Sequence, residues 1–283
     1  MENNEVQDFA DRVKKYYYCK AELCETLMHK GINIESNLMQ MTPVDYNPFD
    51  NCHAEAYIIG CAALEGLSSI YQEINQHGTE QEGSKKRFIS FLKDLRVSEH
   101  LERISTPFLY YCLEKQGIEE SFRNEIKKKW IDQKSQSEAH RFYSDPKIDE
   151  IKLVYQNCHA VNQNSSNETI LNLDRSLQDF TYAALIYKFY RCSFIHEFRA
   201  SQYAVYFNRG NQISVRKFES HLSPSREYLK IDDPKPQLDV GIGLFTESIR
   251  KGADVVHNLI IEKQCRDIRY NSTDEIRIKL KKT

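Results

Sequence analysis

The chain has 283 residues, enough for one large domain or two small ones, and its 39 Lys and Arg nearly balance 41 Asp and Glu, for a formal net charge of −2. This balance excludes a protein that grips duplex DNA along its whole surface, because such proteins carry a marked basic excess. A local basic site for a short single strand is compatible with it. The longest apolar stretch, residues 56–64, is far shorter than the roughly 20 residues of a membrane-spanning helix. We therefore expect a soluble protein with no membrane contact.

The N-terminus and the cysteines indicate the compartment. The first five residues are acidic and polar and show neither the basic start nor the apolar run of a secretory signal. The 8 cysteines include no Cys-x-x-Cys pair, which is typical of reduced, mostly buried thiols. The adjacent pairs at 52–53 and 158–159, each Cys-His, lack the usual spacing of zinc ligands. The sequence thus predicts a cytoplasmic protein without a metal or other cofactor.

Apolar residues recur at helical spacing along most of the chain. The pattern predicts helices at about 5–30, 52–76, 85–95, 98–115, 118–132, 146–158 and 238–265, with a connector at 32–50 and polar loops at 76–84 and 162–167. From about 173 to 198 two apolar stripes cover a single predicted helix, which is typical of a central, buried helix.

A change of period after this helix indicates strands. Residues 203–207 and 213–218 are expected to form a β-hairpin around 208–211, and residues 228–231 to add a strand. The predicted fold is therefore all-α, a helical bundle over 51–270 with a small β insertion at about 203–232 before the last long helix. An N-terminal helix and connector (1–50) precede the bundle, and a tail (271–283) follows it.

Two polar residues, Arg191 and His196, interrupt the stripes of the central helix. A buried guanidinium without a partner is costly, so Arg191 either pairs with a core carboxylate while His196 bonds a carbonyl, or both line a cleft and handle a phosphate. Arg presents a planar fork of donors to phosphate oxygens, and His titrates near neutral pH. On an α-helix their separation would place them about 140° apart. For both side chains to contact one phosphate, either the long Arg191 side chain must span this angle or the helix must be locally distorted.

The spacing Arg191-x4-His196 resembles the R-x(4–6)-H motif of HEPN domains, named for higher eukaryotes and prokaryotes nucleotide-binding. Residues 61–67 are similar to the small-residue and Glu pattern of an early helix of that family, and residues 84–92 to the Arg-Phe helix that follows it in bacterial members. The order of the three segments also fits, and the resemblance covers about 50–270. It implies a bundle of four or five helices that forms a homodimer, with both motifs meeting at the interface.

The resemblance implies a metal-independent endoribonuclease, of the kind found in toxin, phage-defence and CRISPR systems, which binds RNA or a nucleotide and pairs with an antitoxin or another defence partner. His196 would act as general base or acid at the ribose 2′-OH or the leaving oxygen, and Arg191 would stabilise the transition state, leaving a 2′,3′-cyclic phosphate. The expected supporting residues are Cys192, Glu197, Arg199 and Glu65. Glu65 would pair with Arg191 or Arg199, or else face solvent.

Two other functional classes stay open. Cys192 stands where the family often has Asn, Asp or His, so a catalytically silent interaction module with structural Arg191 and His196 is one alternative. A small-molecule-binding bundle with a closed apolar pocket is the other. The basic run 127–129 beside Trp130 is typical of a solvated helix face rather than of an RNA contact.

Overall fold

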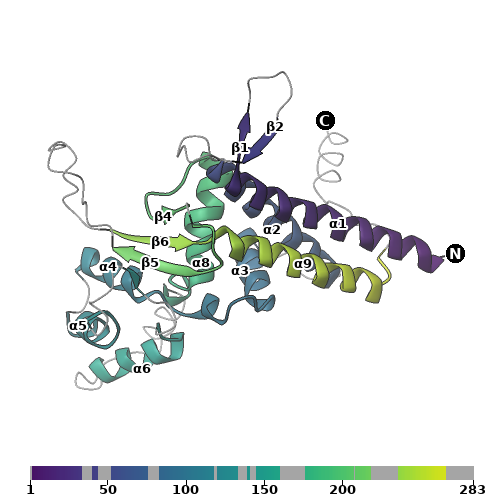
Figure 1. Cartoon of the computed structure of the whole chain (residues 1–283). Coiled ribbons are helices and arrows are strands. Elements are labelled where there is room, and N and C mark those ends of the chain that lie inside the picture. The colour runs from purple at the N-terminus through teal and green to yellow at the C-terminus, as the bar shows by residue number, and fades with distance from the viewer. Residues whose placement is uncertain are drawn as a thin grey trace, which may run out of the picture.

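A computed structural model describes residues 2–33, 40–43, 52–75, 83–117, 120–132, 139–140, 145–159, 176–206, 208–217 and 235–265. These residues are mainly helical, as the sequence predicts, with a small sheet at one end of the helices (Figure 1). No helix among them is long and apolar enough to cross a membrane. The expected strand at 228–231, the loop at 162–167 and the tail at 271–283 lie outside the described residues.

Three long helices form the main body: α1 (Glu2–His29), α2 (His53–Asn75) and α9 (Ile242–Glu262). Each packs against the other two, and α1 lies alongside α9 (Figure 1). Gly60 of α2 faces Phe245 of α9, since a Cβ at Gly60 would lie 3.5 Å from the Phe245 side chain, an ordinary contact distance. Buried residues of all three helices belong to one hydrophobic core, so α1 shares its core with the predicted 51–270 bundle.

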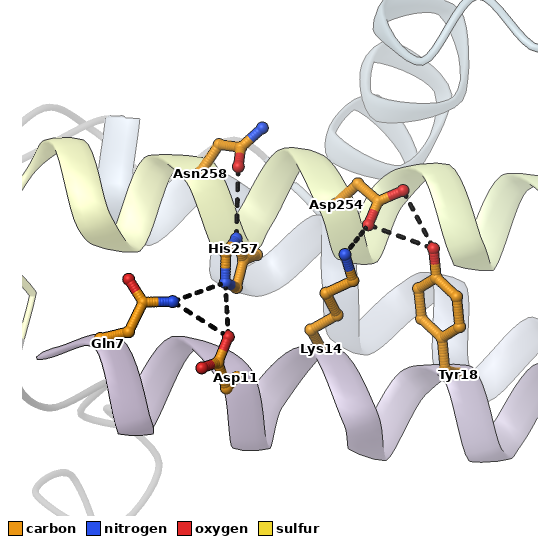
Figure 2. Close-up of polar contacts among 7 residues, drawn as sticks. All are labelled: Gln7, Asp11, Lys14, Tyr18, Asp254, His257 and Asn258. Carbon is orange, nitrogen blue, oxygen red and sulfur yellow. Dashed lines mark hydrogen bonds and ion pairs between the residues drawn. The ribbon is translucent and has the colours of Figure 1, made fainter.

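Polar contacts add to the packing of α1 on α9 (Figure 2). His257 Nε2 lies 2.8 Å from Asp11 Oδ1, and Lys14 Nζ lies 2.7 Å from Asp254 Oδ1. The Tyr18 hydroxyl donates to the Asp254 carboxylate at 3.0 Å. These contacts lie on consecutive turns of both helices and therefore fix the register of α1 along α9.

A second group of helices forms a smaller core beside the sheet. It comprises α4 (Thr106–Gln116), α5 (Glu120–Ile126), the π-helical turn η2 (Lys127–Ile131) and α6 (Ile148–His159). The preceding α3 (Ser84–Asp94) and 3₁₀ turn η1 (Glu99–Glu102) instead bury their apolar residues in the main core. The sequence predicts a single helix at 98–115, but the structure has two separate elements there, η1 and α4. Ile104, between them, forms a β-bridge with Thr181, and Pro107 lies in the first turn of α4. Residues of α4, α5 and α6, including Leu109, Phe122 and Ile151, fill this core.

The central apolar segment is α-helical only in its first part, α8 (Tyr182–Ile186), and continues as the π-helix η5 (Tyr187–Glu197). Phe189 and Phe194 are buried in it, as the two apolar stripes predict, and so is Tyr190 between the stripes, whereas Phe198 at the end of one stripe is exposed. The Tyr190 hydroxyl bonds the backbone of the sheet, with Val205 and Leu238 carbonyls as acceptors and the Val240 N–H as donor. The helix ends at Phe198, whose φ of 52° is left-handed.

The expected β-hairpin is wrong in its pairing. The strands are β3 (Ala139–His140), β4 (Ala204–Val205), β5 (Ile213–Lys217) and β6 (Pro236–Val240), in the spatial order β3-β5-β6-β4. Strand β6 lies between the two expected partners, antiparallel to β5 and parallel to β4. Residues 238–240 were expected at the start of the last helix, but Leu238 and Val240 are buried in the sheet and α9 begins only at Ile242.

The expected connector at 32–50 also contains regular structure. Strands β1 (Lys30–Asn33) and β2 (Gln40–Pro43) form an antiparallel ribbon directly after α1. The connector prediction therefore missed this ribbon, whose residues show no clear alternation of apolar and polar side chains.

Candidate functional site

The π-helix brings Arg191 and His196 together. A π-helix forms i→i+5 hydrogen bonds and has a wider turn than an α-helix, so residues five apart lie on nearly the same face instead of on different faces. The Arg191 Nη1 atom is 2.8 Å from His196 Nε2. The π-helix is therefore a local distortion of the kind that is needed for both side chains to contact one phosphate.

Glu65 on α2 holds the other end of the Arg191 guanidinium. Its Oε2 accepts from Arg191 Nε at 3.1 Å, and its Oε1 accepts from Arg87 Nη2 on α3 at 2.5 Å. The side chains of Arg191, Glu65 and Arg87 are 11%, 19% and 20% exposed. One carboxylate therefore joins α2, α3 and η5 in a largely water-excluded cluster.

The cluster keeps a positive charge. It contains two guanidinium groups, Arg87 and Arg191, and one carboxylate, Glu65, so its formal charge is +1. Burial, the largest single influence, acts to lower the pKa of Arg191, but Glu65, Tyr187 and Cys192 together outweigh it, and the pKa lies above its ordinary value. The guanidinium also lies over the Tyr187 ring at 5.2 Å, and the Tyr187 hydroxyl is 3.0 Å from Ser84 Oγ. Arg191 is thus both charged and fixed in orientation.

His196 marks the solvent-facing end of the site. Its side chain is exposed, near the end of η5. Because a guanidinium only donates hydrogen bonds, His196 Nε2 accepts from Arg191 and carries no proton while this contact exists. The basic nitrogen of His196 therefore lies beside a cation that suits a phosphate oxygen.

The supporting residues divide into two groups. Glu65 pairs with Arg191, one of the two partners expected from the sequence. Arg199 pairs instead with Glu197 at 2.9 Å, and both side chains are exposed. Cys192 is half-buried beside Arg191. Arg87 was missed as a site residue, although it lies in the segment 84–92 that carries part of the family resemblance.

The other groups of potentially reactive side chains do not form a comparable candidate site. Among the described residues no group of three His, Cys, Asp or Glu side chains is arranged to hold a metal ion. Burial raises the pKa of Cys24 to about 12 and that of Cys61 still further, so neither thiol is a ready nucleophile. The Asp11–His257 pair of Figure 2 lies on the α1–α9 face and joins the two helices.

The chain matches no protein-family model, no curated protein and no solved structure. Its function is therefore inferred from the Arg191–His196 pair and its surroundings.

Proposed function

We propose that the protein is a HEPN-like, metal-independent endoribonuclease that binds RNA and cleaves it at Arg191 and His196. The observation that carries the proposal is the 2.8-Å contact between Arg191 Nη1 and His196 Nε2 at the solvent-facing end of an otherwise buried helix. A bacterial toxin or phage-defence setting, with an antitoxin or another defence partner, is the context that the family resemblance implies.

The reaction divides between the two side chains. Attack of a ribose 2′-oxygen on the adjacent phosphorus breaks the bond from phosphorus to the 5′-oxygen, so one proton leaves the 2′-OH and one reaches the 5′-oxygen. When Arg191 turns its Nη1 from His196 to a phosphate oxygen, His196 Nε2 is released from its 2.8-Å contact and transfers one of these protons. Arg191 binds the non-bridging oxygens as negative charge develops on them. The products are a 2′,3′-cyclic phosphate and a 5′-OH.

A homodimer would complete this site. One chain presents a single Arg191–His196 pair, whereas the reaction needs two proton transfers. Two copies related by a two-fold axis would bring two such pairs together. Phe198 supports an interface there, because it is 74% exposed and lies two residues after His196.

One observation favours a second reading, a catalytically silent module in which the cluster only stabilises the bundle. Arg191 is 11% exposed and already paired with Glu65, as a structural arginine would be. The two readings differ in the behaviour of variants. A structural cluster predicts lower stability without any RNase activity, and a catalytic one predicts lost activity in a folded protein.

The deciding experiment is incubation of the full chain with mixed RNA in EDTA, followed by analysis of the product ends. We expect wild-type protein to leave 2′,3′-cyclic phosphate. His196→Ala should lose about 10²–10⁴-fold in rate while still binding RNA. Arg191→Lys should also be inactive, because an ammonium keeps the charge but not the planar fork.

Matched controls come from the contact between α1 and α9. His257→Ala removes another histidine that contacts a side chain, and Arg250→Lys alters another half-buried arginine, which holds Glu25 at 2.6 and 2.7 Å. Both should cleave RNA at the wild-type rate. A wild-type chain that cleaves no RNA would establish the silent module, and active, folded His196 and Arg191 variants would refute the assignment of these residues.

A further inference from the structure

A groove of about 690 Å³ runs between α1 and α2, apart from the Arg191–His196 site. Phe9, Val13 and Tyr16 line it from α1, and Ile59 and Ala62 line it from α2. Tyr16 is 56% exposed although it is a large aromatic side chain. An open apolar surface of this kind is typical of a site that binds another molecule.

The length of the groove fits a short helix. Its lining extends from Phe9 to Lys20 on α1 and from Ile59 to Ile70 on α2, which in each helix is about 16 Å at 1.5 Å per residue. Three turns of a helix have the same length. Small side chains at the centre of the α2 wall, such as Ala62, leave room for a helix to approach closely.

Two cations stand at the edge of the groove on either side of Tyr16. Arg12 and Lys20 both line it and are eight residues apart, about 12 Å along α1. Arg12 Nε donates to the backbone carbonyl of Asp8, and Lys20 Nζ lies 5.0 Å from the centre of the Tyr16 ring. In the part of the chain that the structure describes, neither cation forms an ion pair with a carboxylate. Their charges are therefore available to a bound molecule.

From this combination we propose that the groove binds an amphipathic helix of a partner protein, with apolar residues on one face and two carboxylates eight residues apart. Helices bind grooves through apolar residues at positions i, i+4 and i+7, and the two carboxylates would meet Arg12 and Lys20. The binding is independent of the proposed RNA cleavage.

Two other occupants fit the charges less well. If a second copy paired its α1 antiparallel about Tyr16, Arg12 of each copy would face Lys20 of the other, and these like charges repel. An RNA strand carries a negative charge at every nucleotide and so could not avoid the exposed carboxylates of Asp8 and Asp11 next to Arg12, whereas the proposed helix carries only two carboxylates, placed at Arg12 and Lys20.

The test is selection of a displayed library of 15-residue helical peptides on the full chain, followed by fluorescence anisotropy with the enriched peptides. We expect enriched peptides to carry acidic residues eight positions apart with apolar residues between them. Ala62→Trp, which fills the groove from an exposed position, and the double variant Arg12→Glu/Lys20→Glu should each weaken binding tenfold or more. Lys15→Glu, an exposed charge reversal on α1 outside the groove, should change the affinity less than twofold.

Melting temperatures establish that each variant is folded, and if Ala62→Trp fails to fold, the charge reversal alone decides. The proposal is overturned if no peptide is enriched, if the enriched peptides are basic, or if they bind the folded variants as tightly as wild type. It is also overturned if a single-stranded RNA oligonucleotide binds wild type and loses its affinity in the groove variants, since the groove would then be an RNA site.

Discussion

Glu65 is the residue on which the geometry of the site depends, because both oxygens of its carboxylate accept from different arginines. Glu65→Gln removes the negative charge and leaves Arg87 and Arg191 as two neighbouring, largely buried cations. We expect a loss of about 1–3 kcal/mol in the free energy of unfolding, together with lower RNA cleavage. Thermal melts and the RNA assay measure the two effects. Asp179→Asn, at the exposed ion pair with Lys85, is the control and should change neither.

The residue-level contacts were only partly predictable from the sequence. Glu65 and Arg191 each interrupt an apolar helix, so a contact between them follows from the cost of burying either alone. The sequence did not indicate that Arg87 is buried, because it is one of three consecutive cations. Only the packing of α3 decides which of the three turns toward the core. Lys85 turns outward to Asp179, whereas Arg87 turns inward to Glu65.

At the scale of elements, the long helices were predictable and the sheet was not. Apolar periodicity located α1 and α2 within a few residues, since each presents one face to the core. Strand β6 instead forms because it pairs with β4 and β5. These strands lie well before it in the sequence, and β4 has only two residues, so the local pattern does not reveal the pairing. Likewise, apolar stripes identify a buried helix but do not separate the α-helical from the π-helical part of the central segment.

The junction between β6 and α9 depends on Gly241. A Cβ there would lie 1.9 Å from the carbonyl oxygen of Gly210, a backbone atom that cannot rotate away. Gly241→Ala should therefore destabilise the protein by about 2–4 kcal/mol, measured by thermal or urea unfolding. Gly83→Ala is the matched control, because a Cβ at Gly83 meets nothing within 4 Å, and it should leave the melting temperature within a degree or two. Equal melting temperatures for the two variants would contradict this close approach.

The contact between α1 and α9 predicts a dependence on pH. The hydrogen bond with His257, and then that with Gln7, lowers the pKa of Asp11 below its ordinary value of 3.8. A lowered carboxyl pKa contributes stability above pH 3.8, and this contribution is lost as the pH falls through the folded-state pKa.

Asp11→Asn should therefore lower the melting temperature at pH 7, and its difference from wild type should shrink as the pH falls below 3.8. Melts between pH 7 and pH 2 measure this, with Asp8→Asn on the same helix as the control. A difference that stays constant over the whole range would show that the Asp11–His257 contact contributes no pH-dependent stability.

At the scale of the whole molecule, the Arg191–His196 site lies where separate parts of the fold meet. Glu65 belongs to the three-helix body, Arg87 to α3, and Arg191 to the π-helix, which Tyr190 ties to the sheet. Both guanidinium groups are largely buried, whereas His196 and Phe198 at the end of η5 are exposed. A second chain would have to approach from that side to contribute to the site.

This arrangement predicts a homodimer that uses Phe198. An aromatic side chain that is 74% exposed and lies two residues after His196 is well placed at a two-fold interface. Light scattering at micromolar concentration should give twice the chain mass of 33.3 kDa, and Phe198→Ser should give monomers that no longer cleave RNA. Leu153→Ser, at a side chain that is 58% exposed on α6, should remain dimeric and active. A monomeric wild-type chain, or a Phe198→Ser variant that stays dimeric, would contradict the prediction that two chains form the site together through Phe198.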